Sequence, residues 1–212
     1  MTNNDGAAAG FLRMLEEACP RVAREWFKPT MAPARDAEGV REEYRERVYC
    51  YELYHQLRLL DRTGLGRDAG APAYRLSGEL DKAGLRSVTD DGRHKPDFIW
   101  HIAGNPHGNA AVVEVKHVRG MRGMDKDLAT LAKFLSVDDD RAYSLGVVLV
   151  FGTENRHNVG ARVRAALPDG LDPAAADRIR VLFHGSVGGG LDDLSALAGT
   201  GGGSRPVPSG KL

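Results

Sequence analysis

The stretch KPDFIWHI at residues 95–102 and the stretch AVVEVKHV at residues 111–118 decide the fold of this chain. Apolar, aromatic and β-branched residues dominate both stretches, which is typical of strands in a buried sheet. The sequence between them, AGNPHGNA at residues 103–110, is rich in residues that form turns. We therefore expect strands over residues 97–102 and 111–118 that pair as an antiparallel hairpin.

This hairpin carries charged side chains among its apolar residues. Because side chains alternate between the two faces of a strand, Asp97 and His101 share one face, and Glu114 and Lys116 share one face of the partner strand. If the register brings these faces together, two carboxylates and one amine converge. Carboxylates in apolar surroundings are costly unless a cation neutralises them, and Mg²⁺ favours carboxylate and water oxygens. The hairpin thus predicts a site for Mg²⁺ or Mn²⁺.

The segments around the hairpin predict the rest of the architecture. Periodicity and breakers indicate helices over residues 41–61, 124–136 and 155–166, and strands over residues 74–80, 143–151 and 180–184. This order predicts an α/β fold with a central mixed sheet flanked by helices. We expect three regions, which are an N-terminal helical extension at residues 1–40 interrupted by Pro20, a main domain at residues 41–187, and a disordered Gly/Ser/Pro-rich tail at residues 188–212.

Composition limits the classes of function. With 42% hydrophobic and 27% charged residues the chain can form a packed core, and no run approaches the ~20 apolar residues of a membrane span. No secretory signal pattern is present, so a cytoplasmic location without a membrane partner is expected. The 29 basic and 29 acidic residues cancel, which argues against a generic nucleic-acid coat. A local basic patch remains compatible with a nuclease.

The hairpin resembles the signature of the PD-(D/E)XK nuclease superfamily, reading Pro96-Asp97, a spacer, and then Glu114-Val115-Lys116. The resemblance extends over residues 41–151, where the expected helix, three strands, helix and strand follow the order of the family core. It implies a restriction-endonuclease-like αβββαβ fold and metal-dependent hydrolysis of phosphodiester bonds, with DNA as the expected substrate. It also implies that Asp97, Glu114 and the main-chain carbonyl of Val115 bind the metal and that Lys116 is catalytic.

Many members of that family add an acid from the first core helix. We choose Glu52 as this fourth catalytic residue, because it lies among apolar and aromatic residues where a solvated acid is unusual. The alternative is that Glu52 pairs with Gln56, one turn later, along a half-exposed face. Glu43 and Glu46 are weaker candidates, because they belong to a charged run that is more often a solvated face.

Four further residues are weaker candidates for contacts with the substrate. His101 shares the face of Asp97, and Gln56 lies one turn from Glu52. Lys126 and Lys133 could follow a phosphate backbone, although solvated lysines on a helix are the commoner case. A chain of 212 residues leaves little room for a recognition domain. Specificity is then expected from loops, from a homodimer or from a partner protein.

Two other interpretations remain open at this point. The same fold could act as a binding or interaction module with weak or absent catalysis, which the neutral net charge favours. The chain could also be a structural protein with a chance motif, in which case Asp97, Glu114 and Lys116 would not converge. For the hairpin alone, the alternative is a surface position with an ordinary ion pair between Asp97 and Lys116.

Overall fold

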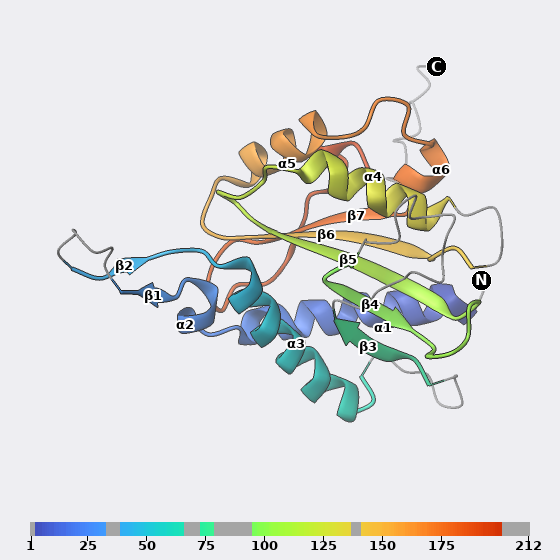
Figure 1. Cartoon of the computed structure of the whole chain (residues 1–212), viewed down its shortest axis with the longest axis horizontal. Coiled ribbons are helices and arrows are strands. Elements are labelled where there is room, and N and C mark those ends of the chain that lie inside the picture. The colour runs from blue at the N-terminus through green and yellow to red at the C-terminus, as the bar shows by residue number, and fades with distance from the viewer. Residues whose placement is uncertain (1–2, 33–38, 66–72, 79–94, 137–140, 201–212) are drawn as a thin grey trace, which may run out of the picture.

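The computed structural model describes residues 3–32, 39–65, 73–78, 95–136 and 141–200. Its centre is a six-stranded mixed sheet with the strand order β3-β4-β5-β6-β7-β8. Helices α1 and α3 lie along one face of this sheet, and α4 and α5 lie along the other (Figure 1). The predicted α/β class, with a mixed sheet flanked by helices, is confirmed.

The central strands are β3 (Arg75–Gly78), β4 (Phe98–His101), β5 (Asn109–His117), β6 (Leu145–Phe151), β7 (Ile179–His184) and β8 (Asp192–Asp193). A small separate sheet pairs β1 (Thr30–Met31) with β2 (Arg41–Glu42). The helices are α1 (Asn3–Ala18), α2 (Arg24–Phe27), α3 (Glu46–Arg62), α4 (Met124–Leu135), α5 (Arg156–Ala165), α6 (Pro173–Ala176) and α7 (Ser195–Ala198), with a 3₁₀ turn η1 (Cys19–Arg21).

The predicted hairpin is present as β4 and β5, which pair antiparallel with Phe98 opposite Val113. Strand β3 pairs antiparallel with β4, whereas β5, β6 and β7 run parallel to one another. Every residue of β6 is buried, as its nearly continuous apolar sequence predicts for a strand covered on both faces. Strand β5 is therefore an inner strand of the sheet, with the antiparallel β4 on one side and the parallel β6 on the other.

Helix α3 begins at Glu46, five residues later than the sequence pattern suggests, because Arg41 and Glu42 belong to β2. Its apolar stripe is buried and consists of Tyr49, Leu53, Leu57 and Leu60. Among the described residues, no helix is both long enough and apolar enough to pass through a bilayer.

The N-terminal region is part of the main core rather than an appended extension. Helix α1 packs against α3 and β5, and the fully buried ring of Phe11 stacks on Trp100 with the ring centroids 5.8 Å apart. The predicted interruption at Pro20 is confirmed, because α1 ends at Ala18 and Pro20 lies in η1. Helix α1, within the expected N-terminal extension at residues 1–40, therefore shares one hydrophobic core with the expected main domain.

The expectation of a disordered tail from Gly188 is wrong as far as Thr200. Strand β8 pairs with β7, and α7 packs against α5 and β7. Leu194 and Ala198 are fully buried, so this segment covers part of the hydrophobic core despite its glycines. Residues 201–212 lie outside the described part of the chain.

Candidate functional site

Asp97 directly precedes β4 and lies beside the end of β5. Phe98 faces Val113 in the ladder, and continuing this register by one residue brings Asp97 opposite Glu114. Residues opposite each other in an antiparallel pair point to the same face of the sheet. The backbone N–H of Val115 donates a hydrogen bond to Oδ2 of Asp97 at 2.7 Å. The two acids predicted from the hairpin are therefore neighbours.

Glu114 is a largely buried carboxylate that forms no hydrogen bond or ion pair with another described residue. Burial raises its pKa well above the usual range, and the negative charges of Asp97 and Asp127 raise it further. The ionised form of Glu114 is therefore unfavourable in the folded chain unless a cation binds near it.

Lys116 lies two residues further along β5, on the same face as Glu114. Its Nζ atom is 3.2 Å from Oδ2 of Asp127 and 3.6 Å from Oε1 of Glu46, and its side chain is only 15% exposed. Burial lowers the pKa of Lys116, but the charges of Glu46 and Asp127 outweigh it and hold this pKa above the ordinary value. Lys116 is therefore a cation at neutral pH.

We call this group the carboxylate cluster, and it consists of Glu46, Asp97, Glu114, Lys116 and Asp127. Burial raises the pKa of Glu46; Lys116 lowers it, while Asp97 and Asp127 raise it, and the net shift is upward. The charges within this cluster thus act on the pKa values of Glu46, Glu114 and Lys116, which shows that the five groups lie close together. The structure thus brings together Asp97, Glu114 and Lys116, as the hairpin pattern predicts.

Asp127 is not indicated as a site residue by the sequence, and Glu46 is only one of the two weaker candidates for the fourth acid. Glu46 is the first residue of α3, and Asp127 lies in the first turn of α4. Acids are common in the first turn of a helix because they interact favourably with the helix dipole. Their sequence positions alone do not distinguish this ordinary role from a place beside Lys116.

Glu52, the expected fourth acid, lies elsewhere. Its Oε1 atom accepts a hydrogen bond from Nε2 of Gln56 at 2.6 Å, which is the alternative that the sequence left open. Six residues separate Glu52 from Glu46, a rotation of about 240° around an α-helix, so the two acids project from different sides of α3. Glu46, and not Glu52, contacts Lys116.

His101 also lies away from the carboxylate cluster. It is four residues from Asp97, a distance of about 13 Å along an extended strand. The register of the β4–β5 pair shifts between Trp100 and His101, and the Nε2 atom of His101 is 3.2 Å from the hydroxyl of Ser77 on β3. The shared face expected for Asp97 and His101 therefore does not bring His101 to the site.

The remaining substrate candidates differ in their relation to the cluster. Gln56 is engaged by Glu52. Lys126 and Lys133 are exposed on α4 and form no ion pair with another described residue. Lys126 adjoins Asp127, whereas Lys133 is about two turns further along the helix. Only Lys126 thus remains near the cluster.

The donor atoms at the end of β5 match a hard divalent cation. They are the carboxylates of Asp97 and Glu114 and the carbonyl of Val115, which faces the same strand edge as the Val115 N–H, just beyond the start of β4. Within the described ranges, no three His, Cys, Asp or Glu side chains gather closely enough to hold a metal ion. A metal here would have at most two side-chain ligands, with the carbonyl and water completing its shell, as Mg²⁺ often accepts.

The site is thus a pair of partly buried acids beside a lysine, with two further acids contributed by the starts of α3 and α4. Comparisons of this chain with models of known protein families, with curated proteins and with solved structures found no match.

Proposed function

We propose that this chain is a metal-dependent nuclease that hydrolyses phosphodiester bonds, with DNA as the expected substrate. The observation that carries the proposal is Glu114, a largely buried carboxylate without a partner among the described residues, placed beside Asp97 and two residues before Lys116. Such an arrangement is costly to the apo fold and becomes favourable when a divalent cation binds. Perturbed acids of this kind concentrate at functional sites.

The order of elements supports a restriction-endonuclease-like αβββαβ core. Helix α3 is followed by the antiparallel strands β3, β4 and β5, then by α4, and then by β6 parallel to β5. This is the helix, three strands, helix and strand that the resemblance to the PD-(D/E)XK superfamily implies. The carboxylates lie at the junction of β4 and β5, where that resemblance puts the metal.

The residues of the site have separable roles in this proposal. Asp97, Glu114 and the carbonyl of Val115 would hold the ion, which when bound supplies a Lewis acid for the phosphate and activates water. Lys116 is protonated and so acts as a hydrogen-bond donor, either to the attacking water or to the charge that develops on the phosphate. Glu46 and Asp127 hold the ammonium of Lys116 from two sides.

Cations near the end of β5 support the binding of a phosphate backbone despite the zero net charge. Arg119 is exposed, forms no ion pair with a described residue, and lies 5.8 Å from the ring centroid of Tyr44. Arg122 and Lys126 are exposed close by in the sequence, at the start of α4. Guanidinium and ammonium groups on this rim would contact phosphates without selecting a base sequence.

The test is cleavage of single-stranded and duplex DNA and RNA in Mg²⁺, in Mn²⁺ and in EDTA. We expect cleavage that needs the metal and falls by about 100-fold or more in Lys116→Ala, because a donor to the developing charge is lost. Arg13→Ala, at an exposed position on α1, is the control and should cleave as the wild type does. Circular dichroism would confirm that both variants fold. If Lys116→Ala does not fold, the milder variant Lys116→Gln takes its place.

The absence of cleavage under all of these conditions, or equal cleavage by Lys116→Ala, would overturn the proposal. A second function is then a binding module without catalysis, which one observation favours. Lys116 is already paired with Glu46 and Asp127, as in a purely structural ion-pair network. Calorimetry with Mn²⁺ separates the two functions, since a module without a metal site would bind no ion and would give the same trace for Asp97→Ala.

A further inference from the structure

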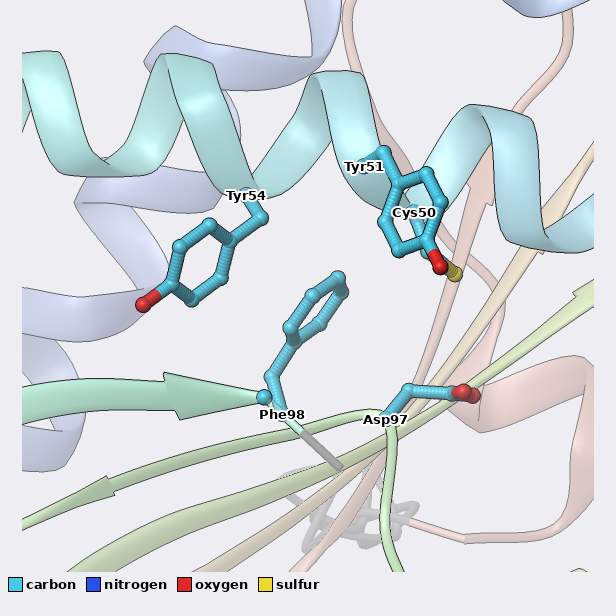
Figure 2. A pocket seen from close by; sticks show the side chains of 6 residues that line it. Cys50, Tyr51, Tyr54, Asp97 and Phe98 are labelled. Atoms are coloured by element: carbon cyan, nitrogen blue, oxygen red, sulfur yellow. The ribbon is translucent and has the colours of Figure 1, made fainter. Parts of the chain in front are cut away.

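A pocket of about 310 Å³ opens beside the carboxylate cluster, between α3 and the β3–β4 edge of the sheet (Figure 2). Its lining residues are Cys50, Tyr51, Tyr54, Gly78, Asp97 and Phe98. Asp97 belongs to both the pocket and the cluster, so any group held in the pocket lies next to the proposed metal site. The volume is at the lower end of the ~300–1,000 Å³ found for ligand pockets.

Three of the six residues that line this pocket are aromatic. Tyr54 and Phe98 stack with their centroids 6.2 Å apart and their planes 23° from parallel, and the Tyr54 hydroxyl donates a hydrogen bond to the Leu76 carbonyl at 3.4 Å. These contacts hold the Tyr54 ring against the sheet. One wall of the pocket is therefore a preorganised aromatic surface.

Tyr51 differs from Tyr54, although both project from the same side of α3 and are three residues apart. Its side chain is 62% exposed and makes no hydrogen bond or ring contact with any described residue. Figure 2 shows its ring extending from α3 toward the carboxylate of Asp97. An exposed aromatic ring at the mouth of an aromatic pocket is suited to stacking on a flat ligand.

The charge and shape of the lining narrow the kind of ligand. The lining contains one acid, Asp97, and no basic side chain, so a phosphate inside the pocket would be repelled. A neutral and flat group is compatible with it, and every nucleobase is such a group. Gly78 adds no side chain to the pocket, and an added Cβ would already be in van der Waals contact with the Asp97 carbonyl oxygen at 3.4 Å and with Tyr54 at 3.7 Å.

We propose that this pocket binds an unpaired nucleobase whose neighbouring phosphate lies at the carboxylate cluster. A base inside a duplex is stacked and paired, and cannot enter a pocket of this kind without being extruded. The preferred substrate is therefore single-stranded nucleic acid, or a strand with an unpaired nucleotide at the cleavage position. This inference rests on the proposed nuclease function, because only that function makes the neighbouring carboxylate cluster the place where a phosphate is bound and cleaved.

The experiment measures binding separately from cleavage. Fluorescence anisotropy with a labelled single-stranded oligonucleotide, and with the duplex of the same sequence, is recorded in Mg²⁺ with Lys116→Ala as the parent protein. Adding Tyr51→Ala should weaken single-strand binding by about fivefold or more, the low end of what one stacked base contributes. Gly78→Val, which narrows the pocket without an aromatic loss, should weaken it in the same direction.

The matched control is Trp26→Ala, which removes an aromatic side chain that is 42% exposed on α2 and does not line the pocket. It should leave single-strand binding unchanged. Duplex binding should be weaker than single-strand binding and should respond to none of the three substitutions. A protein in which Tyr51→Ala and Gly78→Val bind the single strand as the parent does would overturn the pocket assignment.

Cleavage by the chain with an intact Lys116 distinguishes the two proposals. If it cuts single strands and duplexes equally, and Tyr51→Ala cuts as fast, the nuclease stands and the pocket assignment is wrong. If it cuts nothing while binding still depends on Tyr51, the nuclease proposal is wrong and the base pocket stands.

Discussion

The ammonium of Lys116, at the end of β5, lies 3.6 Å from a carboxylate oxygen of Glu46, the first residue of α3. Asp127 approaches the same ammonium at 3.2 Å from the start of α4. Because Lys116 is mostly buried, solvent screens these pairs less than it screens a pair at the surface. Glu46 and Asp127 therefore fix the position of Lys116, and Glu46 is a positioning residue in the proposed reaction.

Glu46→Gln is expected to lower kcat by about 10–100-fold, which is the usual effect of removing a group that orients a catalytic side chain. KM should change little, because Glu46 contacts Lys116 rather than the substrate. Glu52→Gln is the comparison on the same helix, and it should keep nearly full activity, since Glu52 is engaged by Gln56. The measurement is steady-state kinetics on one oligonucleotide substrate. If Glu52→Gln were the slower enzyme, the assignment of Glu46 as the positioning residue would be wrong.

Asp97 combines a structural and a proposed metal-binding role, and two substitutions separate them. Asp97→Ala removes the acceptor for the Val115 N–H and should lower the free energy of unfolding by about 1–3 kcal/mol. Asp97→Asn keeps an acceptor oxygen and should unfold within about 1 kcal/mol of the wild type, yet lose Mn²⁺ binding. Urea denaturation and calorimetry measure the two effects. An Asn variant that binds Mn²⁺ normally would remove Asp97 from the metal site.

The sequence was sufficient to predict the hairpin because its signal is local. Alternation along β5 and the run of turn formers before it determine which side chains share a face, and Asp97, Glu114 and Lys116 follow from that. The position of His101 did not follow, since the register shift next to Trp100 depends on how the loop closes. A pattern with a period of two does not anticipate such a shift.

The acids from the helices depend on tertiary packing and could not be selected from the sequence. Glu46 and Glu52 both lie in α3, and only the rotation of that helix over the sheet decides which one reaches Lys116. The apolar neighbours of Glu52 suggested an unusual carboxylate, but Gln56 satisfies it within the helix. The C-terminal segment is a related case, because its glycines suggest disorder whereas Leu194 packs into the core.

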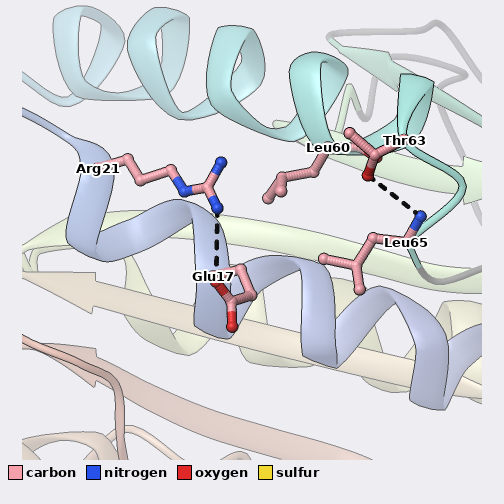
Figure 3. Close-up of polar contacts among 5 residues, drawn as sticks. All are labelled: Glu17, Arg21, Leu60, Thr63 and Leu65. Atoms are coloured by element: carbon pink, nitrogen blue, oxygen red, sulfur yellow. Dashed lines mark hydrogen bonds and ion pairs between the residues drawn. The ribbon is translucent and has the colours of Figure 1, made fainter.

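The integration of α1 into the core is tested by Phe11→Ala. The Phe11 ring is fully buried against Trp100, and its loss should lower the free energy of unfolding by about 3–5 kcal/mol. The same helix offers a control at its exposed end, where Arg21 pairs with Glu17 at 3.5 Å (Figure 3). Glu17→Ala should cost at most about 1 kcal/mol, as exposed ion pairs do. Urea denaturation would contradict an integrated core if the two variants were equally stable.

Glu114→Gln should stabilise the metal-free protein at neutral and alkaline pH. The pKa of Glu114 is raised in the folded chain, first by burial and then by Asp97 and Asp127, so the folded state holds this proton more tightly than the unfolded state does. The favourable contribution of protonated Glu114 is complete below the unfolded pKa of about 4.3 and is lost as the pH rises through the higher folded value. Glutamine keeps the shape and carries no charge at any pH.

In EDTA, the melting temperature of Glu114→Gln should therefore exceed that of the wild type at pH 8, and the difference should shrink toward zero near pH 4. One kcal/mol corresponds to roughly 2–4 °C for a chain of this size. Saturating Mn²⁺ at pH 8 should reverse the order, because a bound cation stabilises the wild-type carboxylate and the glutamine offers a weaker ligand. Thermal scans at pH 4, 6 and 8 make this comparison. A difference between the two proteins that is the same at all three pH values would show that the Glu114 carboxylate does not titrate as its burial requires.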